Sequence, residues 1–369
     1  MPESLKKKAV KGVVWSAIDS IEINQNNFTI KMENNPLVVI SCMTYNHAHY
    51  IEDAMNGFCM QKSNFPFVVL IVDDASTDGE QDLIKKYLNE YFEMENARRW
   101  ETNDAHYIET RHKENRNCWF VAVLLKHNFY QKKKDKWPLI AEWENAAKYV
   151  AVCEGDDYWT DSNKLQKQVD FLESHPDYSM CFHDVNIKAE KGRTWYKVFG
   201  KLEDRDYTGI ENLVTWSVPT CSIVCLSKIY KTRPSNPKFT MGDNVLILHC
   251  SRNGKIRCIP EKMGVYRLTP TSWIGGQSSK VQRYKYISHY YGLIEEFEEC
   301  HCKPVYDLME NQYFQLLTIL KREGDKAEFN RVKGEYLNYP GETHCNKFKR
   351  YYVKSRLRSE LKRLLCLTK

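Results

Sequence analysis

The sequence predicts an α/β fold in which helices flank a mostly parallel central sheet. Three segments, 37–42, 67–72 and 149–152, are apolar without alternation, which indicates strands buried on both faces. Each segment runs directly into a polar turn, and apolar residues at helical spacing follow the first two turns. Ligands of such sheets bind beyond the carboxyl ends of the strands. We therefore expect the three polar turns to face one crevice.

The first turn contains Thr44, Tyr45 and Asn46, and apolar residues at helical spacing come after it. His47 and His49 flank this turn. Histidines in such positions line or cap a loop more often than they touch a substrate. The turn is therefore expected to lead from a buried strand into a helix.

The second turn begins with Asp73 and Asp74 at the end of the second apolar segment. Thr77 and Glu80 have the spacing of a capping box, so a helix is expected to begin there. Apolar residues recur on one face over 83–91, which is typical of a helix packed on a core.

The third turn, residues 154–157, places three carboxylates at the carboxyl end of a predicted strand. Clustered carboxylate oxygens are ligands that Mg²⁺ and Mn²⁺ prefer. Gly155 is expected to let a ligand approach the backbone closely. Acidic turns after strands are common, however, so this pattern alone leaves a simple solvated turn as the alternative.

Together the three turns resemble those of the family 2 inverting glycosyltransferases, which have the GT-A nucleotide-sugar-binding fold. The resemblance rests on residues 40–46, 71–78, 154–159 and 164–168, and it covers about positions 36 to 275. The form Glu-Gly-Asp-Asp-Tyr-Trp at 154–159 looks like that of bacterial enzymes of surface-polysaccharide assembly.

The resemblance implies a metal-dependent hexosyltransferase that moves a sugar from a nucleotide-sugar donor, UDP-linked, to a saccharide or lipid-linked oligosaccharide acceptor. It implies Mn²⁺ or Mg²⁺ as cofactor, held by Asp157 and Asp156, and leaves open which of the two ligates the metal. Asp74 would accept a hydrogen bond from a uracil-like ring. The implied nucleotide-sugar site consists of Thr44, Tyr45, Asn46, Asp73, Asp74, Asp156 and Arg267.

Inverting transfer needs a general base that takes a proton from the acceptor hydroxyl. The resemblance assigns this role to Asp243, which stands at the start of an apolar helical segment. Without the resemblance, a helix N-cap is the simpler interpretation of Asp243. Asp204 and Asp206 are the next candidates for the base. A glutamine-tryptophan signature of processive synthases is missing from the sequence, which favours one transfer per acceptor.

Related proteins often carry a Tyr-Arg-x-His pattern, and residues 266–269 keep only its first two positions. Arg267 is expected to bind the diphosphate through its planar fork. Thr269 stands where the histidine would be, which leaves an inactive carbohydrate-binding relative as the alternative function.

Two other classes fit the chain poorly. Residues 69–74 also resemble the opening of a signalling receiver domain, but the apolar segment 118–125 leads into Lys126 and not into a phosphoacceptor aspartate. A haloacid-dehalogenase phosphatase would need a second acid at the position of Ala75.

The pattern divides the chain into an N-terminal arm (1–35), a GT-A domain (36–280, with an insertion at 95–148) and a helical C-terminal region (281–369). The tail 347–369 is basic and leucine-bearing, so one face is expected to lie on an anionic membrane, the alternative being a solvated helix packed on its own domain. Thirteen cysteines without an export signal favour a reduced cytoplasmic protein, peripheral on the inner face of the membrane. The net charge of +6 is mild, and no nucleic-acid partner is expected.

Overall fold

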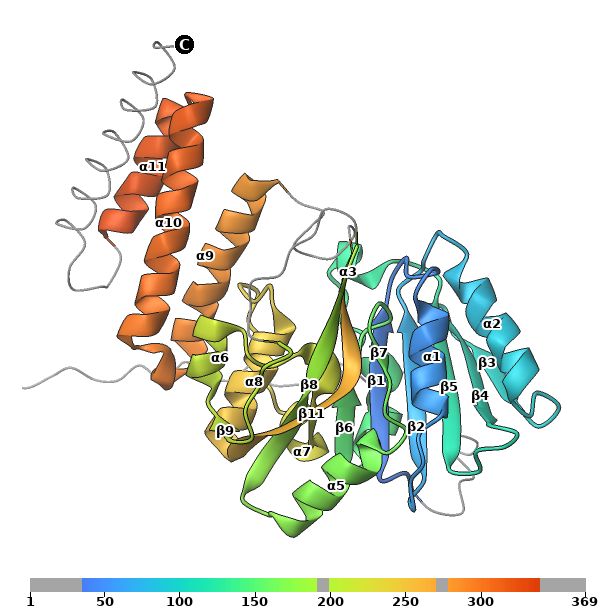
Figure 1. Cartoon of the computed structure of the whole chain (residues 1–369). Coiled ribbons are helices and arrows are strands. Elements are labelled where there is room, and N and C mark those ends of the chain that lie inside the picture. Colours follow the sequence, from blue (N-terminus) through green and yellow to red (C-terminus); the bar gives the residue numbers. More distant parts are fainter. Residues whose placement is uncertain (1–34, 191–198, 270–277, 339–369) are drawn as a thin grey trace, which may run out of the picture. The chain divides into compact units, whose positions relative to one another are not determined.

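The computed structural model describes residues 35–190, 199–269 and 278–338. Its strands form one sheet in the order β3-β4-β5-β2-β1-β6-β10-β8-β11-β7, and β9 pairs with β11 (Figure 1). The strands are β1 (Val38–Thr44), β2 (Phe67–Asp73), β3 (Arg98–Glu101), β4 (Ala105–Arg111), β5 (Cys118–Leu125), β6 (Tyr149–Val152), β7 (Tyr158–Trp159), β8 (Tyr178–Ala189), β9 (Asp206–Tyr207), β10 (Val224–Leu226) and β11 (Lys255–Leu268).

The helices are α1 (Ile51–Cys59), α2 (Glu80–Tyr91), α3 (Phe129–Lys132), α4 (Trp137–Ala146), α5 (Lys164–Ser174), α6 (Gly209–Thr215), α7 (Ser227–Tyr230), α8 (Gly242–Asn253), α9 (Ser279–Glu296), α10 (Lys303–Glu323) and α11 (Lys326–Leu337). Two 3₁₀ turns lie at Thr220–Ser222 and Glu298–Cys300.

The centre of the sheet consists of four parallel strands, β5-β2-β1-β6. Every residue of β2 is buried, as expected for an apolar strand covered on both faces. Antiparallel pairings of β3 with β4, β4 with β5 and β10 with β6 extend this centre, so the whole sheet is mixed. The predicted α/β fold with helices around a central sheet is confirmed.

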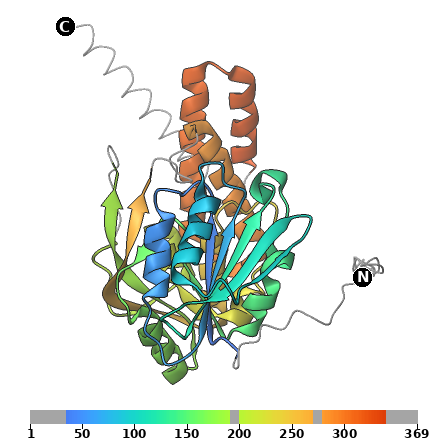
Figure 2. The ribbon, with the colours of Figure 1, turned by 90° about the vertical axis from the view of Figure 1, so that its right-hand side faces the viewer.

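Helices cover both faces of the central strands (Figure 2). The main apolar core joins α1, α2 and α5 to one face, to which β1 contributes Val38, Ile40 and Cys42. On the opposite face, Ser41 of β1 donates a hydrogen bond to Glu144 of α4 at 3.0 Å. The sheet is therefore fixed from both sides, and its carboxyl edge is free to carry polar turns.

The predicted C-terminal helical extension is confirmed in α9, α10 and α11. These helices share a second apolar core with α6 and α8, which includes Leu213, Leu248, Leu293 and Leu316. No helix of the described residues is long and apolar enough to cross a membrane. The N-terminal arm and the basic tail 347–369 lie outside the described residues.

The segment 95–148, predicted as an insertion, contains β3, β4, β5, α3 and α4. Its strand β5 pairs in parallel with β2, from Phe67 with Cys118 to Asp73 with Leu124. This segment therefore supplies one of the central strands, and the domain boundaries drawn from the sequence stay a prediction.

Candidate functional site

The first two polar turns lie side by side because β1 and β2 are in register. Thr44 pairs with Asp73 at the strand ends, and the Asp74 N–H donates to the Thr44 carbonyl at 3.0 Å. The Asn46 N–H donates to Ser76 Oγ at 2.8 Å, and the Thr77 N–H donates to Asn46 Oδ1 at 2.8 Å. Backbone and side chains thus join the two turns into one unit.

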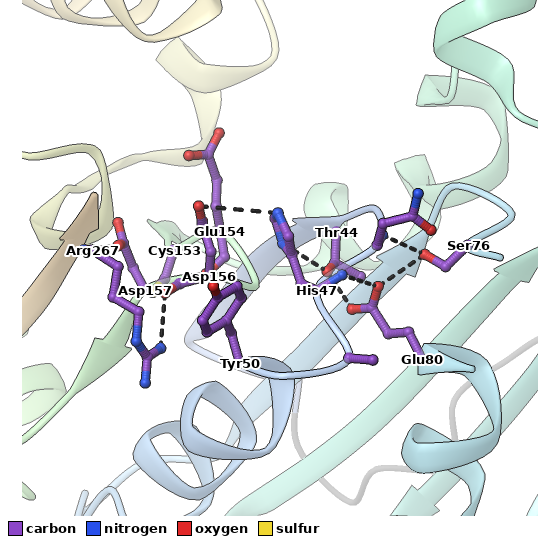
Figure 3. Close-up of polar contacts among 12 residues, drawn as sticks. Thr44, His47, Tyr50, Ser76, Glu80, Cys153, Glu154, Asp156, Asp157 and Arg267 are labelled. Atoms are coloured by element: carbon purple, nitrogen blue, oxygen red, sulfur yellow. Dashed lines mark hydrogen bonds and ion pairs between the residues drawn. The ribbon is translucent and has the colours of Figure 1, made fainter. Parts of the chain in front are cut away.

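The buried carboxylate of Glu80 lies at the centre of this unit (Figure 3). It accepts hydrogen bonds from the Thr44 hydroxyl, from the His47 N–H at 2.9 Å and from the Ser76 hydroxyl at 2.8 Å. Burial raises the pKa of Glu80, and these donors oppose that rise. Glu80 therefore fixes the shape of the first turn.

The capping box expected between Thr77 and Glu80 is not formed. Gly79 is the N-cap of α2, with φ of 91°, and the helix has no side-chain cap hydrogen bond. The Glu80 side chain turns back to the first turn because Thr44, His47 and Ser76 offer it three donors. The sequence spacing predicted Thr77 as the partner of Glu80, which is wrong, and no local sequence pattern points to Thr44.

Asp73 and Asp74 accept hydrogen bonds from the second turn and from neighbouring elements. Asp73 Oδ1 accepts from the Ser76 N–H at 3.0 Å and from Gln81 Nε2 at 2.6 Å. Asp74 accepts from the backbone N–H groups of Phe129 and Tyr130 at 2.6 and 3.1 Å, and its Oδ2 is 3.0 Å from the Lys136 ammonium. These contacts hold the start of α3 against the predicted nucleotide site.

Tyr45 and Asn46 occupy the tip of the first turn. Tyr45 has 37% of its surface exposed, and Asn46 has φ of 57°, in the left-handed region that asparagine tolerates better than most residues. The tip therefore presents an aromatic ring to solvent next to Asn46, whose backbone is held by Ser76 and whose side chain is held by Thr77.

The third turn packs directly on the first. The Cys153 N–H donates to the Ser41 carbonyl and the Gly155 N–H to the Met43 carbonyl, both at 3.3 Å. A Cβ added to Gly155 would lie 2.2 Å from Thr44 Oγ1. Glycine is therefore required here by Thr44, and the expectation that it also admits a ligand to the backbone stays a prediction.

Asp156 and Asp157 point in different directions from this turn (Figure 3). The Asp156 carboxylate faces the imidazole of His47, with Oδ2 4.0 Å from Nε2. Asp157 is 2% exposed, and its Oδ1 accepts from the Arg267 N–H at 2.7 Å. Burial, reinforced by the charge of Asp156, raises the pKa of Asp157 well above its usual range.

Asp243 joins the acidic turn from a distant part of the chain. Partial removal from water raises the pKa of Glu154 to about 8, and the charges of Asp156 and Asp243 add to the rise. Burial also raises the pKa of the Tyr266 phenol well above its usual range, together with the charges of Asp157, Glu154, Asp243 and Asp156. Tyr266, which we did not predict as a site residue, therefore lies among the four carboxylates.

Asp243 is not the N-cap of α8, which is Met241. Its carboxylate is half-buried and accepts from the Asn244 N–H at 2.8 Å. Burial raises the pKa of Asp243, while the Asn244 N–H and the Thr220 side chain oppose the rise. The alternative candidates Asp204 and Asp206 are exposed and pair with Arg257 at 2.8 and 3.2 Å.

Arg267 is engaged within the protein. The residue is 4% exposed, its guanidinium pairs with Asp53 of α1 and donates to the Asp156 carbonyl at 2.8 Å. The guanidinium carbon lies 5.2 Å from the Tyr50 ring centre and 4.3 Å from that of Tyr158. Arg267 thus braces the acidic turn against α1, and Thr269 beyond it is fully buried.

The donor chemistry of the acidic turn fits a divalent cation, because it offers clustered carboxylate oxygens, and burial together with the neighbouring carboxylates raises the pKa values of Glu154 and Asp157. Among the described residues, no three His, Cys, Asp or Glu side chains are arranged to hold a metal ion by themselves. Mg²⁺ and similar ions commonly use one or two carboxylates together with substrate phosphates. The turn therefore suits a metal that is shared with a phosphate-bearing substrate.

Residues 39–115, which run from β1 through β4, match the family model described as glycosyl transferase family 2. The matched segment carries the first two polar turns, so this part of the chain is similar to glycosyl transferase family 2.

Two relatives are similar in sequence. An uncharacterized protein of Mycobacterium tuberculosis (strain H37Rv) is 31% identical over 233 residues, which are 62% of this chain and 58% of that protein. TuaG of Bacillus subtilis (strain 168), named as a teichuronic acid biosynthesis glycosyltransferase, is 26% identical over 172 residues, 47% of this chain and 56% of TuaG. The chain thus spans less than two thirds of the length of either relative.

Two solved structures match over most of the chain at low sequence identity. Staphylococcus aureus TarS 1–349 in complex with UDP matches over 82% of this chain and 75% of that chain, with 14% identity and a TM-score of 0.46. The mannosyltransferase PcManGT of Pyrobaculum calidifontis, in complex with GDP-Man and Mn²⁺, matches over 88% and 84%, with 12% identity and a TM-score of 0.46.

Proposed function

We propose that this protein is an inverting, metal-dependent glycosyltransferase that makes one transfer per acceptor in surface-polysaccharide biosynthesis. The donor is a UDP-linked sugar, and the acceptor is a saccharide or a lipid-linked oligosaccharide. The observation that carries the proposal is the convergence of Glu154, Asp156 and Asp157 with Asp243, beside turns of a family 2 segment. The name of TuaG supports the polysaccharide pathway.

The donor side of the proposed site is formed by the first two turns. Thr44, Tyr45 and Asn46 line the nucleotide, and the exposed Tyr45 ring suits stacking on a base. Asp73 supports them from within the second turn. A carboxylate has about four acceptor sites, so Asp74, which takes contacts from Phe129, Tyr130 and Lys136, retains capacity for a base N–H.

The diphosphate side lies at the acidic turn. A divalent cation bound there would offset the charge of the departing diphosphate. Arg267 stabilises this part of the site because it holds the Asp156 carbonyl and the Asp157 carboxylate with separate donors. In this proposal the positive charge of Arg267 attracts the diphosphate from behind the acidic turn. It replaces the direct bidentate contact between Arg267 and the diphosphate that we expected from the sequence.

Asp243 acts as the general base in this proposal. Its carboxylate takes the proton of the acceptor hydroxyl while that oxygen attacks the anomeric carbon and the bond to the diphosphate breaks. Burial raises the pKa of Asp243, which makes it a better proton acceptor than an exposed aspartate. Its position at the start of α8 keeps the carboxylate rigid through the Asn244 N–H.

Calorimetry with UDP tests the donor and metal parts of the proposal. UDP should bind more tightly with Mn²⁺ or Mg²⁺ than in EDTA, and Asp157→Ala should weaken binding because it releases the acidic turn from Arg267. Equal affinity for UDP in EDTA and Mn²⁺ would exclude the metal. A panel of nucleotide sugars, followed by release of the nucleotide, then identifies the donor.

The inactive alternative is favoured by Thr269, which is fully buried where related proteins carry a histidine. An inactive relative would bind a nucleotide or saccharide without releasing free nucleotide from any donor in the panel. Turnover that Asp243→Asn abolishes would exclude it.

Membrane contact of the tail 347–369 is a separate part of the proposal. Its basic, leucine-bearing sequence predicts sedimentation with anionic liposomes that declines with salt, since charge attraction is screened over about 10 Å at 0.1 M. Deletion of 347–369 should release the protein. Unchanged sedimentation after deletion would exclude the tail as the membrane contact.

A further inference from the structure

The imidazole of His47 is held in one orientation between the first turn and the acidic turn (Figure 3). Its Nδ1 is 3.2 Å from Thr44 Oγ1, and its Nε2 is 4.0 Å from Asp156 Oδ2. The His47 N–H is bound by Glu80, so the backbone is fixed as well. The side chain is 16% exposed.

The partners of the ring indicate which nitrogen carries the proton. The Thr44 hydroxyl donates its hydrogen to Glu80, so Thr44 Oγ1 can only accept from His47 Nδ1. In the neutral ring Nδ1 therefore carries the proton, and Nε2 presents its lone pair. This lone pair faces the carboxylate of Asp156, which is also an acceptor.

Two acceptors that face each other call for a positive partner between them. The separation of 4.0 Å between Nε2 and Asp156 Oδ2 is too long for a hydrogen bond. Two ligands that are each about 2.1 Å from one octahedral cation lie roughly 3.0 Å apart when adjacent and roughly 4.2 Å apart when opposite. The observed separation lies between these two values, so one cation can reach both atoms after a small shift of either side chain.

Asp157 does not compete for this position. Its Oδ1 accepts from the Arg267 N–H at 2.7 Å, and the residue is 2% exposed. The Cys221 side chain is a further hydrogen-bond partner of the same carboxylate. Asp157 therefore faces the protein interior, whereas Asp156 faces His47.

We propose that His47 Nε2 and the Asp156 carboxylate are the protein ligands of the divalent cation, with diphosphate oxygens and water completing its coordination. This inference rests on the proposed function and names the metal ligands of that site. Asp157 is a positioning residue that orients the turn. Because imidazole nitrogen is a better ligand for Mn²⁺ than for Mg²⁺, the site favours Mn²⁺.

Electron paramagnetic resonance of Mn²⁺ bound to the full chain with UDP tests the assignment. Spin-echo modulation should show a ¹⁴N nucleus coupled to Mn²⁺, and His47→Gln should abolish that coupling. The same variant should lose about tenfold or more of the gain in UDP affinity that Mn²⁺ provides, a loss seen even for residues that only orient metal ligands. Affinity for UDP in EDTA should not change.

His49→Gln is the matched control. His49 lies in the same segment, and both histidine rings meet the Tyr50 ring edge-on with centroids 6.3 Å apart, but His49 is exposed. This variant should keep the ¹⁴N coupling and the full effect of Mn²⁺. Circular dichroism of both variants checks that each is folded.

A ¹⁴N coupling that persists in His47→Gln, or one that is missing from the wild type while Mn²⁺ still strengthens UDP binding, would overturn the inference and leave glycosyl transfer standing. Failure of Mn²⁺ to bind with UDP would overturn the inference and the metal dependence together. Failure of UDP to bind under any condition would overturn the proposed function itself.

Discussion

The two polar regions at the carboxyl edge of the sheet handle negative charge in opposite ways. In the paired first and second turns, Glu80 accepts from Thr44, His47 and Ser76. In the acidic turn, removal from water raises the pKa of Glu154 to about 8, and the charges of Asp156 and Asp243 add to the rise. The Glu80 carboxylate thus has its donors, whereas the acidic turn keeps charge that a cation or a proton can neutralise.

The largest expected effect comes from removing the proposed base. Asp243→Asn should lower turnover by about 10² to 10⁴-fold, because the proton of the acceptor hydroxyl loses its acceptor. UDP affinity should stay near that of the wild type, whereas Asp74→Ala should lose UDP affinity first. Steady-state kinetics and calorimetry separate the two. Near-normal turnover of Asp243→Asn at saturating substrates would move the search to Asp204 and Asp206.

Removing the Glu80 carboxylate should destabilise the protein, whereas neutralising one carboxylate of the acidic turn should not. Glu80→Ala leaves the donors of Thr44, His47 and Ser76 without their acceptor, at a cost of about 3 kcal/mol in the free energy of unfolding. Glu154→Gln removes a like charge and should leave stability unchanged or raise it. Urea unfolding at pH 7 measures both variants. An equal loss of unfolding free energy in the two variants would contradict the difference between the two regions.

Glu144 tests how burial shifts the pKa of a carboxyl group that lies outside the acidic turn. It is 1% exposed, and burial raises its pKa to about 7, although Arg233 and the Ser41 hydroxyl oppose the rise. Because the unfolded carboxyl ionises first, stability should fall as pH rises from about 4.5 to about 7, by roughly 3 kcal/mol at most.

Glu144→Gln should flatten this part of the stability profile, and thermal unfolding between pH 4.5 and 7.5 measures it. A wild-type profile that is already flat, or one that the substitution leaves unchanged, would contradict the assignment of the pH dependence to Glu144.

The smallest expected effect concerns the contact between the two regions. Gly155→Ala would force a Cβ against Thr44 Oγ1 and should cost about 1–3 kcal/mol of stability. Gly334→Ala is the control, because nothing lies within 4 Å of its added Cβ. In the helix α11 this change should stabilise by up to about 1 kcal/mol. Effects of the same sign in the two variants would argue against steric contact at Gly155.

The sequence by itself determined the strand–turn units, the position of the acidic turn and the C-terminal helices, because buried strands and amphipathic helices leave local patterns of apolar residues. It also gave the resemblance to family 2 glycosyltransferases, since the three motifs occur in that order, and residues 39–115 match the model of that family. Residues 118–125 were recognised as an apolar segment, but their place beside β2 required the pairing from Phe67 with Cys118 to Asp73 with Leu124.

Only the tertiary structure decided which partner each polar residue takes. Glu80 turns to Thr44 and not to Thr77, Asp157 turns to the backbone of Arg267, 110 residues away, and Asp156 is left to face His47. A hydrogen bond depends on the distance and direction between two groups, and sheet pairing brings together residues that no local spacing relates. The chemistry of the candidate site therefore lies in contacts that appear only when the chain is folded.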